Sequence, residues 1–401
     1  MRKTIVSIVA LAGIVVAACG GGTPATSPTA ATATTAATKA AIKLGAILPL
    51  TGPSAATGQD MKDGYELARE QINAAGGANG APIEVIYEDD KNDPATAVAS
   101  WEKLVSSDKV EVMMGGLAST ISAALIEPAK KAQVPMAWTG AAATSVEQGF
   151  QGQDWFFHYH PWEYQNAQST LAFLKTSPVK KWAVVYEDGL FGTGAFNGFK
   201  TTLPAQGQEL TIGEAFKTGS TDFTALINRV KASGAEGLIM VPFAGDMIPF
   251  LTQMREIGYK PKLIYASPPS FPPDFAKSPV AEGVAGATLW TADIPAPASK
   301  KFVADFQKKY NKLPVSYWSA LAFTNLVTVA NALAKSGAGN KAGWISAMEA
   351  TNYESPLGPT LKFTPSNTIK HQGFTGLISF QFQGGKQEIV FPDNLKTAPL
   401  K

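Results

Sequence analysis

Short apolar runs alternate with longer segments of helical period along most of this chain. The first run, 42–50, leads into a loop of small residues, and apolar positions from Met61 to Ile72 then recur at spacings of three and four. Gly58 disfavours a helix, so the helix is expected to begin at Asp60. Later runs of strand length lie at 83–87, 110–114, 134–138, 181–186, 210–216, 237–242, 263–266 and 284–290. Strands that alternate with helices in this way build parallel sheets covered on both faces, so the pattern predicts an α/β fold.

The alternation breaks at 154–164, where aromatic and imidazole rings follow one another closely. It restarts at Lys181 and continues to a long apolar helix expected at 316–335. We interpret the break as a crossover between two doubly wound lobes, with the rings packed at the boundary between them.

Two histidines in this segment raise the alternative of a metal site. His158 and His160 would share one face of an extended segment, and Glu163 is close in sequence. A zinc site needs three or four ligands, and the remaining histidine, His371, is far away in the chain. Packing of the rings is therefore favoured over metal binding, and neither a metal nor another cofactor is expected.

Composition narrows the class of protein. A chain of 401 residues is too long for one ordinary hydrophobic core, so two or more domains are expected. Apolar residues make up 45% of the chain, enough for large cores. Charge is nearly balanced, with 34 basic and 32 acidic residues and no basic run beyond the amino terminus, so nucleic acid is not an expected partner. The one cysteine is Cys19, which excludes internal disulfides and a catalytic thiol deeper in the chain.

The amino terminus has the order of a secretory signal. Arg2 and Lys3 precede an apolar run that is shorter than a membrane span, and the sequence 16–20 resembles the bacterial lipobox. This resemblance implies that residues 1–19 are a lipoprotein signal and that Cys19 carries lipid. Residues 20–40 are rich in Gly, Thr, Ala, Pro and Ser, which predicts a flexible tether.

A protein tethered outside the cytoplasm has no ready supply of ATP or NADH, which favours binding over kinase or dehydrogenase activity. A hydrolase remains an alternative. The sequence has no Gly-x-Ser-x-Gly nucleophile elbow and too few histidines for a Ser-His-Asp triad placed in loops, so an enzyme is not expected.

Four motifs stand close together near the start of the predicted fold, at 50–53, 64–68, 72–80 and 89–94. Through them the region 45–93 closely resembles the amino-terminal part of the type I periplasmic binding proteins of the leucine/isoleucine/valine-binding family. The resemblance implies two lobes joined by three crossovers, with a small-molecule ligand held in the cleft between them. It further implies delivery to the membrane permease of an ABC importer by a monomeric, lipid-anchored receptor. A sensor that docks on a membrane receptor is an alternative that the sequence does not exclude.

The resemblance also implies domain boundaries and ligand contacts. Lobe 1 is expected to comprise 41–162 and 291–376, and lobe 2 to comprise 163–290 and 377–401. Ser119 and Thr120 have the alternative role of capping the following helix, and each aromatic ring has the alternative of being core. The implied ligand contacts are Thr57, Ser119, Thr120, Trp138, Thr139, Gly140, Ala141, Ala142, Phe191, Phe243 and Ser267.

The ligand class follows from a departure from the family pattern. Amino-acid binders of the family place a carboxylate near Ser267 to hold the ligand's ammonium group, and this chain has Ser267 and Pro268 there. An unpaired buried ammonium costs several kcal/mol. A hydrophobic or aromatic carboxylic acid is therefore favoured over a branched-chain amino acid. The alternative stays open because four acidic residues elsewhere have the chemistry to replace the missing one, Glu163, Glu187, Asp188 and Asp246.

Overall fold

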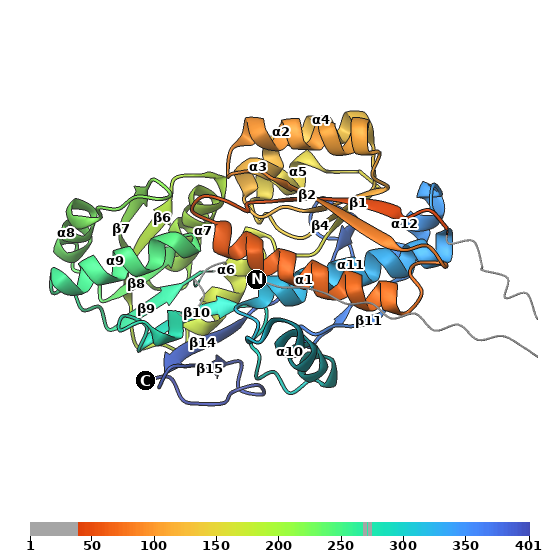
Figure 1. Ribbon diagram of the computed structural model, residues 1–401. Coiled ribbons are helices and arrows are strands. Elements are labelled where there is room, and N and C mark those ends of the chain that lie inside the picture. Colours follow the sequence, from red (N-terminus) through yellow and green to blue (C-terminus); the bar gives the residue numbers. More distant parts are fainter. Residues whose placement is uncertain (1–38, 268–270, 272–274) are drawn as a thin grey trace, which may run out of the picture. The chain divides into compact units, whose positions relative to one another are not determined.

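The computed structural model describes residues 39–267, 271 and 275–401 (Figure 1). Two large sheets organise these residues, and we name the parts of the chain built on them lobe 1 and lobe 2. The strand order of lobe 1 is β13-β5-β4-β3-β1-β2, and that of lobe 2 is β15-β14-β10-β9-β8-β6-β7. The strands of lobe 1 are β1 (Ile42–Leu48), β2 (Ile83–Asp89), β3 (Val112–Gly115), β4 (Met136–Trp138), β5 (Phe156–His158) and β13 (His371–Gln372). Those of lobe 2 are β6 (Lys181–Glu187), β7 (Glu209–Phe216), β8 (Gly237–Val241), β9 (Leu263–Ala266), β10 (Val284–Thr288), β14 (Ile378–Gln383) and β15 (Lys386–Phe391).

Among the described residues the chain crosses from one sheet to the other three times, between β5 and β6, between β10 and β13, and between β13 and β14. Helices pack against these sheets, and a short antiparallel pair stands apart from them, β11 (Tyr353–Glu354) with β12 (Thr360–Leu361). The predicted fold class of two α/β lobes is confirmed. The helices are α1 (Ala55–Ala74), α2 (Pro94–Glu102), the π-helix η1 (Lys103–Asp108), α3 (Ser119–Ala124), α4 (Ile126–Ala132), α5 (Thr144–Gly149), α6 (Glu163–Leu174), α7 (Leu190–Ala205), α8 (Thr224–Ala232), α9 (Ala244–Glu256), the 3₁₀ turn η2 (Phe275–Lys277), α10 (Pro297–Tyr310), α11 (Tyr317–Ser336) and α12 (Lys341–Glu349).

The two sheets differ in strand direction. The described ladders of lobe 1 are all parallel, whereas β14 and β15 add an antiparallel edge to lobe 2. Gly384 and Gly385 form the two-residue connection between these strands, with φ of 58° and 78°. Positive φ at both positions is the requirement of a tight β-hairpin, which glycine meets without strain.

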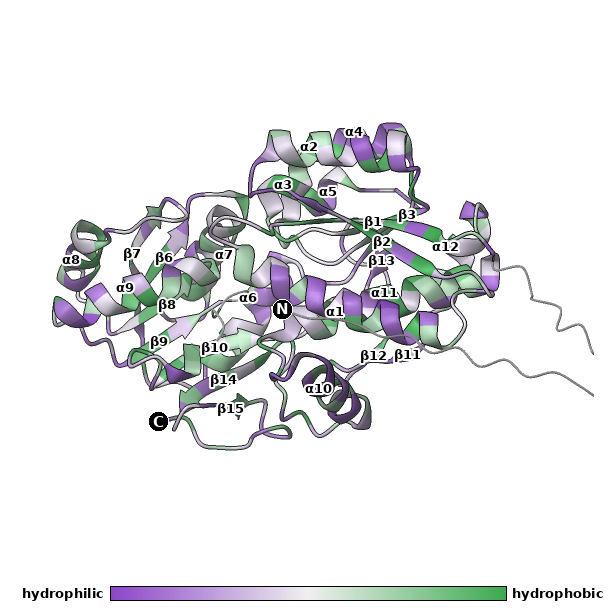
Figure 2. Cartoon of the chain, in the orientation of Figure 1, coloured by the Kyte–Doolittle hydropathy of each residue, from purple (hydrophilic) through white to green (hydrophobic). Residues whose placement is uncertain are grey.

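Alternation along the strands of lobe 2 builds two hydrophobic layers. On β6, Trp182 and Val184 face the layer that contains α6 and α7, whereas Ala183 and Val185 face the layer that contains α8 and α9. Successive side chains of a strand point to opposite faces, so a sheet buried on both faces needs a continuous apolar run. The runs recognised in the sequence at 83–87 and 210–216 belong to the edge strands β2 and β7, and the other runs are inner strands. Purple and green residues alternate along a helix such as α1 (Figure 2).

The start of α1 differs from the sequence-based expectation. The helix begins at Ala55 and contains Gly58, whereas we expected Gly58 to precede a helix starting at Asp60. A Cβ atom at Gly58 would lie 2.1 Å from the carbonyl oxygen of Pro49. Glycine at this position therefore lets the helix pack directly on the end of the preceding strand.

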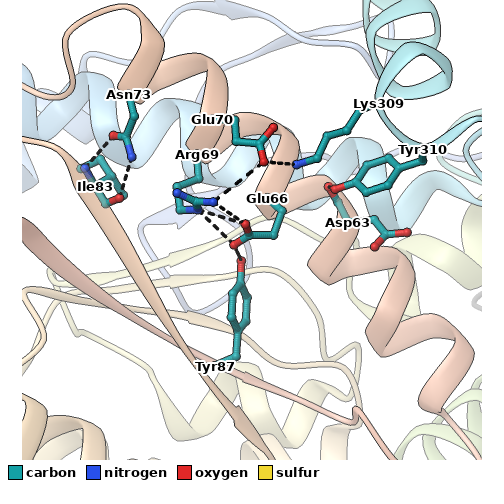
Figure 3. Close-up of polar contacts among 9 residues, drawn as sticks. All are labelled: Asp63, Glu66, Arg69, Glu70, Asn73, Ile83, Tyr87, Lys309 and Tyr310. Carbon is teal, nitrogen blue, oxygen red and sulfur yellow. Dashed lines mark hydrogen bonds and ion pairs between the residues drawn. The ribbon is translucent and has the colours of Figure 1, made fainter. Parts of the chain in front are cut away.

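Polar contacts fix the other half of α1 to its neighbours (Figure 3). The amide of Asn73 donates to the carbonyl of Ile83 at 2.9 Å and accepts from its N–H at 2.7 Å, which ties the end of the helix to the start of β2. Glu66 accepts from Arg69 and from the hydroxyl of Tyr87 on β2, at 2.7 and 2.8 Å. These contacts hold α1 in place, and its first half borders the region where the lobes meet.

Candidate functional site

A small cavity lies where the loops of the two lobes meet, near α3 of lobe 1 and α7 of lobe 2, which lie side by side (Figure 1). Its volume is about 10 Å³, which leaves room for about one water molecule. All but one of its lining residues follow the carboxyl end of a parallel strand, where α/β proteins place their ligands. The lining residues are Leu117, Ser119, Ala141, Ala142, His160, Phe191, Phe243 and Trp318.

Aromatic rings from both lobes form the walls. In lobe 2 the rings of Phe191 and Phe243 lie 6.1 Å apart at an angle of 40°, and in lobe 1 His160 is stacked on Trp318 at 5.2 Å and 7°. These four side chains are at most 6% exposed. Rings arranged in this way contact a flat or apolar body from several sides.

His160 is neutral at physiological pH. Its Nδ1–H donates to the carbonyl of Pro161 at 2.8 Å, so Nε2 is the atom that accepts from the hydroxyl of Tyr317 at 3.0 Å. Burial lowers the pKa of His160 to about 3. Because no Asp, Glu, Lys or Arg is among the lining residues, the described wall carries no formal charge.

Ser119 provides a hydroxyl at this wall. Its Oγ accepts from the N–H groups of Ala142 and Ala143, each at 3.1 Å. These bonds use the oxygen and leave the O–H hydrogen available to an acceptor in the cavity. Ser119 is the first residue of α3, and the N-cap residue, Ala118, makes no side-chain cap bond. Ser119 thus supports the turn after β4 instead of acting as the N-cap of α3.

Thr120 joins the lobes at the rim instead of lining the cavity. Its Oγ1 accepts from the N–H of Leu190, the first residue of α7, at 3.4 Å. A second rim contact lies at Pro53, whose carbonyl oxygen is 2.9 Å from the position that a Cβ atom of Gly245 would occupy. The lobes are therefore in contact over the cavity.

The structure places three of the expected contact residues away from the cavity. Trp138 is fully buried and donates from Nε1 to the hydroxyl of Ser122 at 2.9 Å. Thr139 is bound to the hydroxyl of Tyr65 at 2.5 Å, and the carbonyl of Gly140 lies 2.9 Å from His158 Nε2. Trp138 ends the inner strand β4, and Thr139 and Gly140 follow it in the lobe 1 core. Of the four residues 138–141, only Ala141 lines the cavity.

Thr57 and Ser267 also lie outside the lining. Thr57 is buried on α1, and Ser267, which follows β9, lies beside Phe191 in a neighbouring space. Pro268 lies outside the described residues. Three lining residues were absent from the set expected from the sequence, namely Leu117, His160 and Trp318.

The sequence held signals for two of these three residues. His160 stands in the aromatic run that we assigned to the lobe boundary. Trp318 stands two residues after Ser316, whose hydroxyl accepts from the Trp318 N–H at 3.2 Å and caps α11. The sequence therefore predicts the start of a long apolar helix, but it does not predict that this start faces the carboxyl ends of the lobe 1 strands.

His158 contacts the loop after β4 that carries Ala141. Its Nε2 lies 2.9 Å from the carbonyl oxygens of both Gly140 and Ala141, and its ring is stacked on Trp162 at 3.7 Å. Within the described residues, no group of three or more His, Cys, Asp and Glu side chains has the arrangement of a metal site.

Two of the acidic residues considered above hold loops of lobe 2. Glu187 accepts from the N–H groups of Gly189 and Gly192, each at 2.6 Å, and Asp246 accepts from the N–H of Gly219 at 2.8 Å. Burial raises the pKa of both carboxyls. Neither residue lines the cavity, and Asp188 is exposed.

A larger cavity of about 580 Å³ borders the second and third crossovers. Its lining includes Leu289, Leu357, Phe374 and Leu377, and none of the ligand contacts expected from the sequence. The part of the chain that the structure describes has no helix with both the length and the apolar character needed to cross a membrane. Cys19 lies outside the described residues.

Comparisons with known proteins agree with this architecture. The profile of a family described as periplasmic binding protein matches residues 41–386. The chain is 27% identical over 375 residues to Leu/Ile/Val-binding protein homolog 7 of Brucella abortus, covering 88% of this chain and 92% of that protein.

Two solved structures are similar in fold. One is the branched-chain amino acid transporter substrate-binding protein LivJ from Streptococcus pneumoniae in complex with isoleucine, with a TM-score of 0.76, 24% identity and coverage of 88% of this chain and 100% of LivJ. The other is an ABC transporter solute-binding protein from R. palustris in complex with benzoate, with a TM-score of 0.78, 18% identity and coverage of 89% and 99%.

Proposed function

Because the chain belongs to the type I periplasmic binding proteins of the Leu/Ile/Val-binding family, we propose that it is an extracytoplasmic receptor that delivers a small molecule to an ABC importer. The observation that carries the proposal is the uncharged, ring-lined cavity between the lobes. On this proposal the protein binds its ligand without transforming it. The permease subunits of the importer are its partners in the membrane.

We further propose that the ligand is a small carboxylic acid with a hydrophobic or aromatic body. The rings of Phe191, Phe243 and Trp318 offer apolar contact, and the hydroxyl of Ser119 offers a donor to a carboxylate. The isoleucine of LivJ and the benzoate of the R. palustris protein both combine a carboxylate with an apolar body. Benzoate lacks an ammonium group, which matches a wall without a charged partner for one.

Closure of the lobes is the proposed binding step. A ligand shifts a protein between two states only by its difference in affinity for them. Phe191 and Phe243 come from lobe 2, whereas Ser119 and Trp318 come from lobe 1, so all four contact a ligand together only when the lobes meet. The hydrogen bond from the Leu190 N–H to Thr120 Oγ1 further stabilises the closed state.

The lipid anchor is a separate part of the proposal. It rests on the order Arg2, Lys3, apolar run and Cys19 in the sequence. An anchored protein is expected to fractionate with membranes. Retention of a Cys19→Ser variant in the membrane fraction, with its signal removed, would contradict the anchor.

A thermal-shift screen of matched pairs tests the proposed ligand class. Each amino acid is compared with its deaminated acid, such as phenylalanine with 3-phenylpropanoate and leucine with 4-methylpentanoate, and benzoate is added. A ligand present at a hundredfold its Kd adds about 2.7 kcal/mol to the free energy of unfolding. We expect the acids to stabilise the protein more than the amino acids. Stabilisation by leucine, isoleucine or valine alone would show that a carboxylate holds the amine.

A further inference from the structure

A second group of residues lies behind the ring of Phe191. Phe191 is the one residue that lines both the cavity between the lobes and this neighbouring space. The neighbouring space itself has no free volume for a water molecule, so a ligand group enters it only if the Phe191 side chain turns. The neighbouring space is lined by Glu163, Asn166, Ala167, Phe191, Ala195, Phe199 and Ser267.

Asn166 presents an unpaired acceptor to this space. The side chain is 3% exposed, and its Nδ2 donates to the carbonyl of Pro161 at 3.4 Å. Because a carbonyl only accepts, this bond fixes which end of the amide is the oxygen. Asn166 Oδ1 is buried and has no hydrogen-bond partner.

Glu163 presents a second unpaired acceptor. It is the first residue of α6, and its N–H donates at 2.6 Å to the carbonyl of Ala142, which lines the main cavity. Its carboxylate accepts from Thr144, and its Oε2 is buried without a partner. A Cβ atom at Gly194 would lie 2.0 Å from that oxygen, so only glycine lets α7 approach so closely.

The two acceptors lie one helical turn apart. Residues three apart in a helix share a face, so Glu163 and Asn166 border the same space. Buried polar atoms in folded proteins are almost always paired, and an unpaired acceptor is costly. What both atoms lack is a donor, and neither the phenylalanines nor the alanines beside them offer one, whereas Ser267 brings a hydroxyl to the same space.

We propose that this space is a subsite for a hydrogen-bond donor on the ligand, a hydroxyl or amino group carried at the opposite end of the apolar body from the carboxylate. The subsite rests on the proposed function, since the carboxylate is placed at Ser119 and the body between the rings. When such a ligand binds, the ring of Phe191 turns aside and the donor reaches Glu163 Oε2 and Asn166 Oδ1. The preferred ligand is thus a hydroxylated or amino-substituted aromatic acid, and Glu163 and Asn166 determine that preference.

Titration calorimetry with substituted aromatic acids tests the subsite. Benzoate and phenylacetate are each compared with their 4-methyl, 4-hydroxy and 4-aminomethyl derivatives, in which the methyl group matches the size of the hydroxyl without its donor. We expect the 4-hydroxy or the 4-aminomethyl acid to bind at least tenfold more tightly than the 4-methyl acid. The comparison between these two derivatives tells a hydroxyl from an ammonium donor.

Variants locate the preference at the proposed residues. Asn166→Leu removes the acceptor at nearly constant volume, and Glu163→Gln removes the charge. Each is expected to reduce the advantage of the donor-bearing acid over the 4-methyl acid to less than threefold. Gln168→Ala, at an exposed position of α6, serves as the control and is expected to keep the full advantage.

Two outcomes separate the subsite from the function on which it rests. If the unsubstituted acids bind and the 4-methyl acid binds as tightly as both donor-bearing acids, the subsite is wrong and the proposed function stands. If none of the acids binds, the proposed ligand class and the subsite are both overturned. An unchanged preference in both Asn166→Leu and Glu163→Gln would also overturn the subsite.

Discussion

Phe191→Ala is expected to weaken binding of an aromatic acid without a second polar group, such as benzoate, by about 30- to 1,000-fold, the loss of about 2–4 kcal/mol typical of a buried aromatic anchor. The ring is 6% exposed, lies 6.1 Å from Phe243 and lines the cavity between the lobes. Its removal takes away one wall of the site and leaves Phe243 without its neighbour. Titration calorimetry of the variant and the wild type measures the change.

A ring elsewhere on the same helix provides the control. Phe196 is stacked on Tyr186 at 4.5 Å and does not line the cavity. Phe196→Ala is expected to lower stability and to leave the affinity within about twofold. Equal affinity of Phe191→Ala and the wild type would show that the ligand lies elsewhere.

Asp60→Asn is expected to make the protein more stable than the wild type at pH 7, by up to about 3 kcal/mol. Asp60 is 3% exposed, and burial raises its pKa from 3.8 to about 6. Asp60 Oδ2 accepts from the Ser316 hydroxyl at 2.6 Å and from the Ser319 N–H at 3.3 Å, which an asparagine oxygen can also do. The variant therefore keeps these bonds to the start of α11 and loses the buried charge.

The raised pKa of Asp60 also sets how the stability difference between Asp60→Asn and the wild type changes with pH. A carboxyl with a raised pKa binds its proton more tightly in the folded state than in the unfolded state, so its contribution to stability falls as pH rises from about 4 to about 6. The variant lacks this loss. Urea unfolding from pH 4 to pH 7 is expected to show its advantage over the wild type growing through that interval and levelling above it.

Subtracting the unfolding free energy of the wild type from that of Asp60→Asn at each pH removes the contributions of the titrating groups that both proteins share. Asp90, whose pKa burial also raises to about 6, is present in both. A difference in unfolding free energy that is constant from pH 4 to pH 7 would show that Asp60 does not titrate in this interval.

The fold was largely predictable because its strands are buried on both faces. An inner strand such as β8 contributes Leu238 and Met240 to one layer and Ile239 and Val241 to the other, so its sequence is a plain apolar run. The start of α1 was less predictable. Gly58 has the local preference of a helix breaker, and only the approach of Pro49 shows why it lies inside the helix.

The site was predictable in part because strand ends are visible in a sequence and side-chain directions are not. Ser119, Ala141, Phe191 and Phe243 line the cavity, as the resemblance implied. Trp138 has the residue type of a ligand contact, yet its ring packs on Gly116 within lobe 1. Whether such a ring faces core or cleft depends on the loops beside it, and these are set by tertiary packing.

His160 and Trp318 line the cavity although the sequence did not predict them as ligand contacts. They are 158 residues apart in the sequence and become stacked because the chain returns to lobe 1 after its second crossing. No local pattern predicts that pairing. The sequence placed His160 in the ring-rich segment at the lobe boundary and Trp318 in the apolar helix expected at 316–335, and the fold brings them together at the cavity wall.

The central claim is that a ligand closes the two lobes over the ring-lined cavity. Small-angle X-ray scattering with and without the best acid from the matched-pair screen tests it most directly, on protein that begins after Cys19. We expect the radius of gyration to fall at saturation, because the rim contacts of Thr120 and Pro53 form as the lobes meet. An unchanged radius of gyration, with saturation shown by calorimetry on the same sample, would contradict the claim.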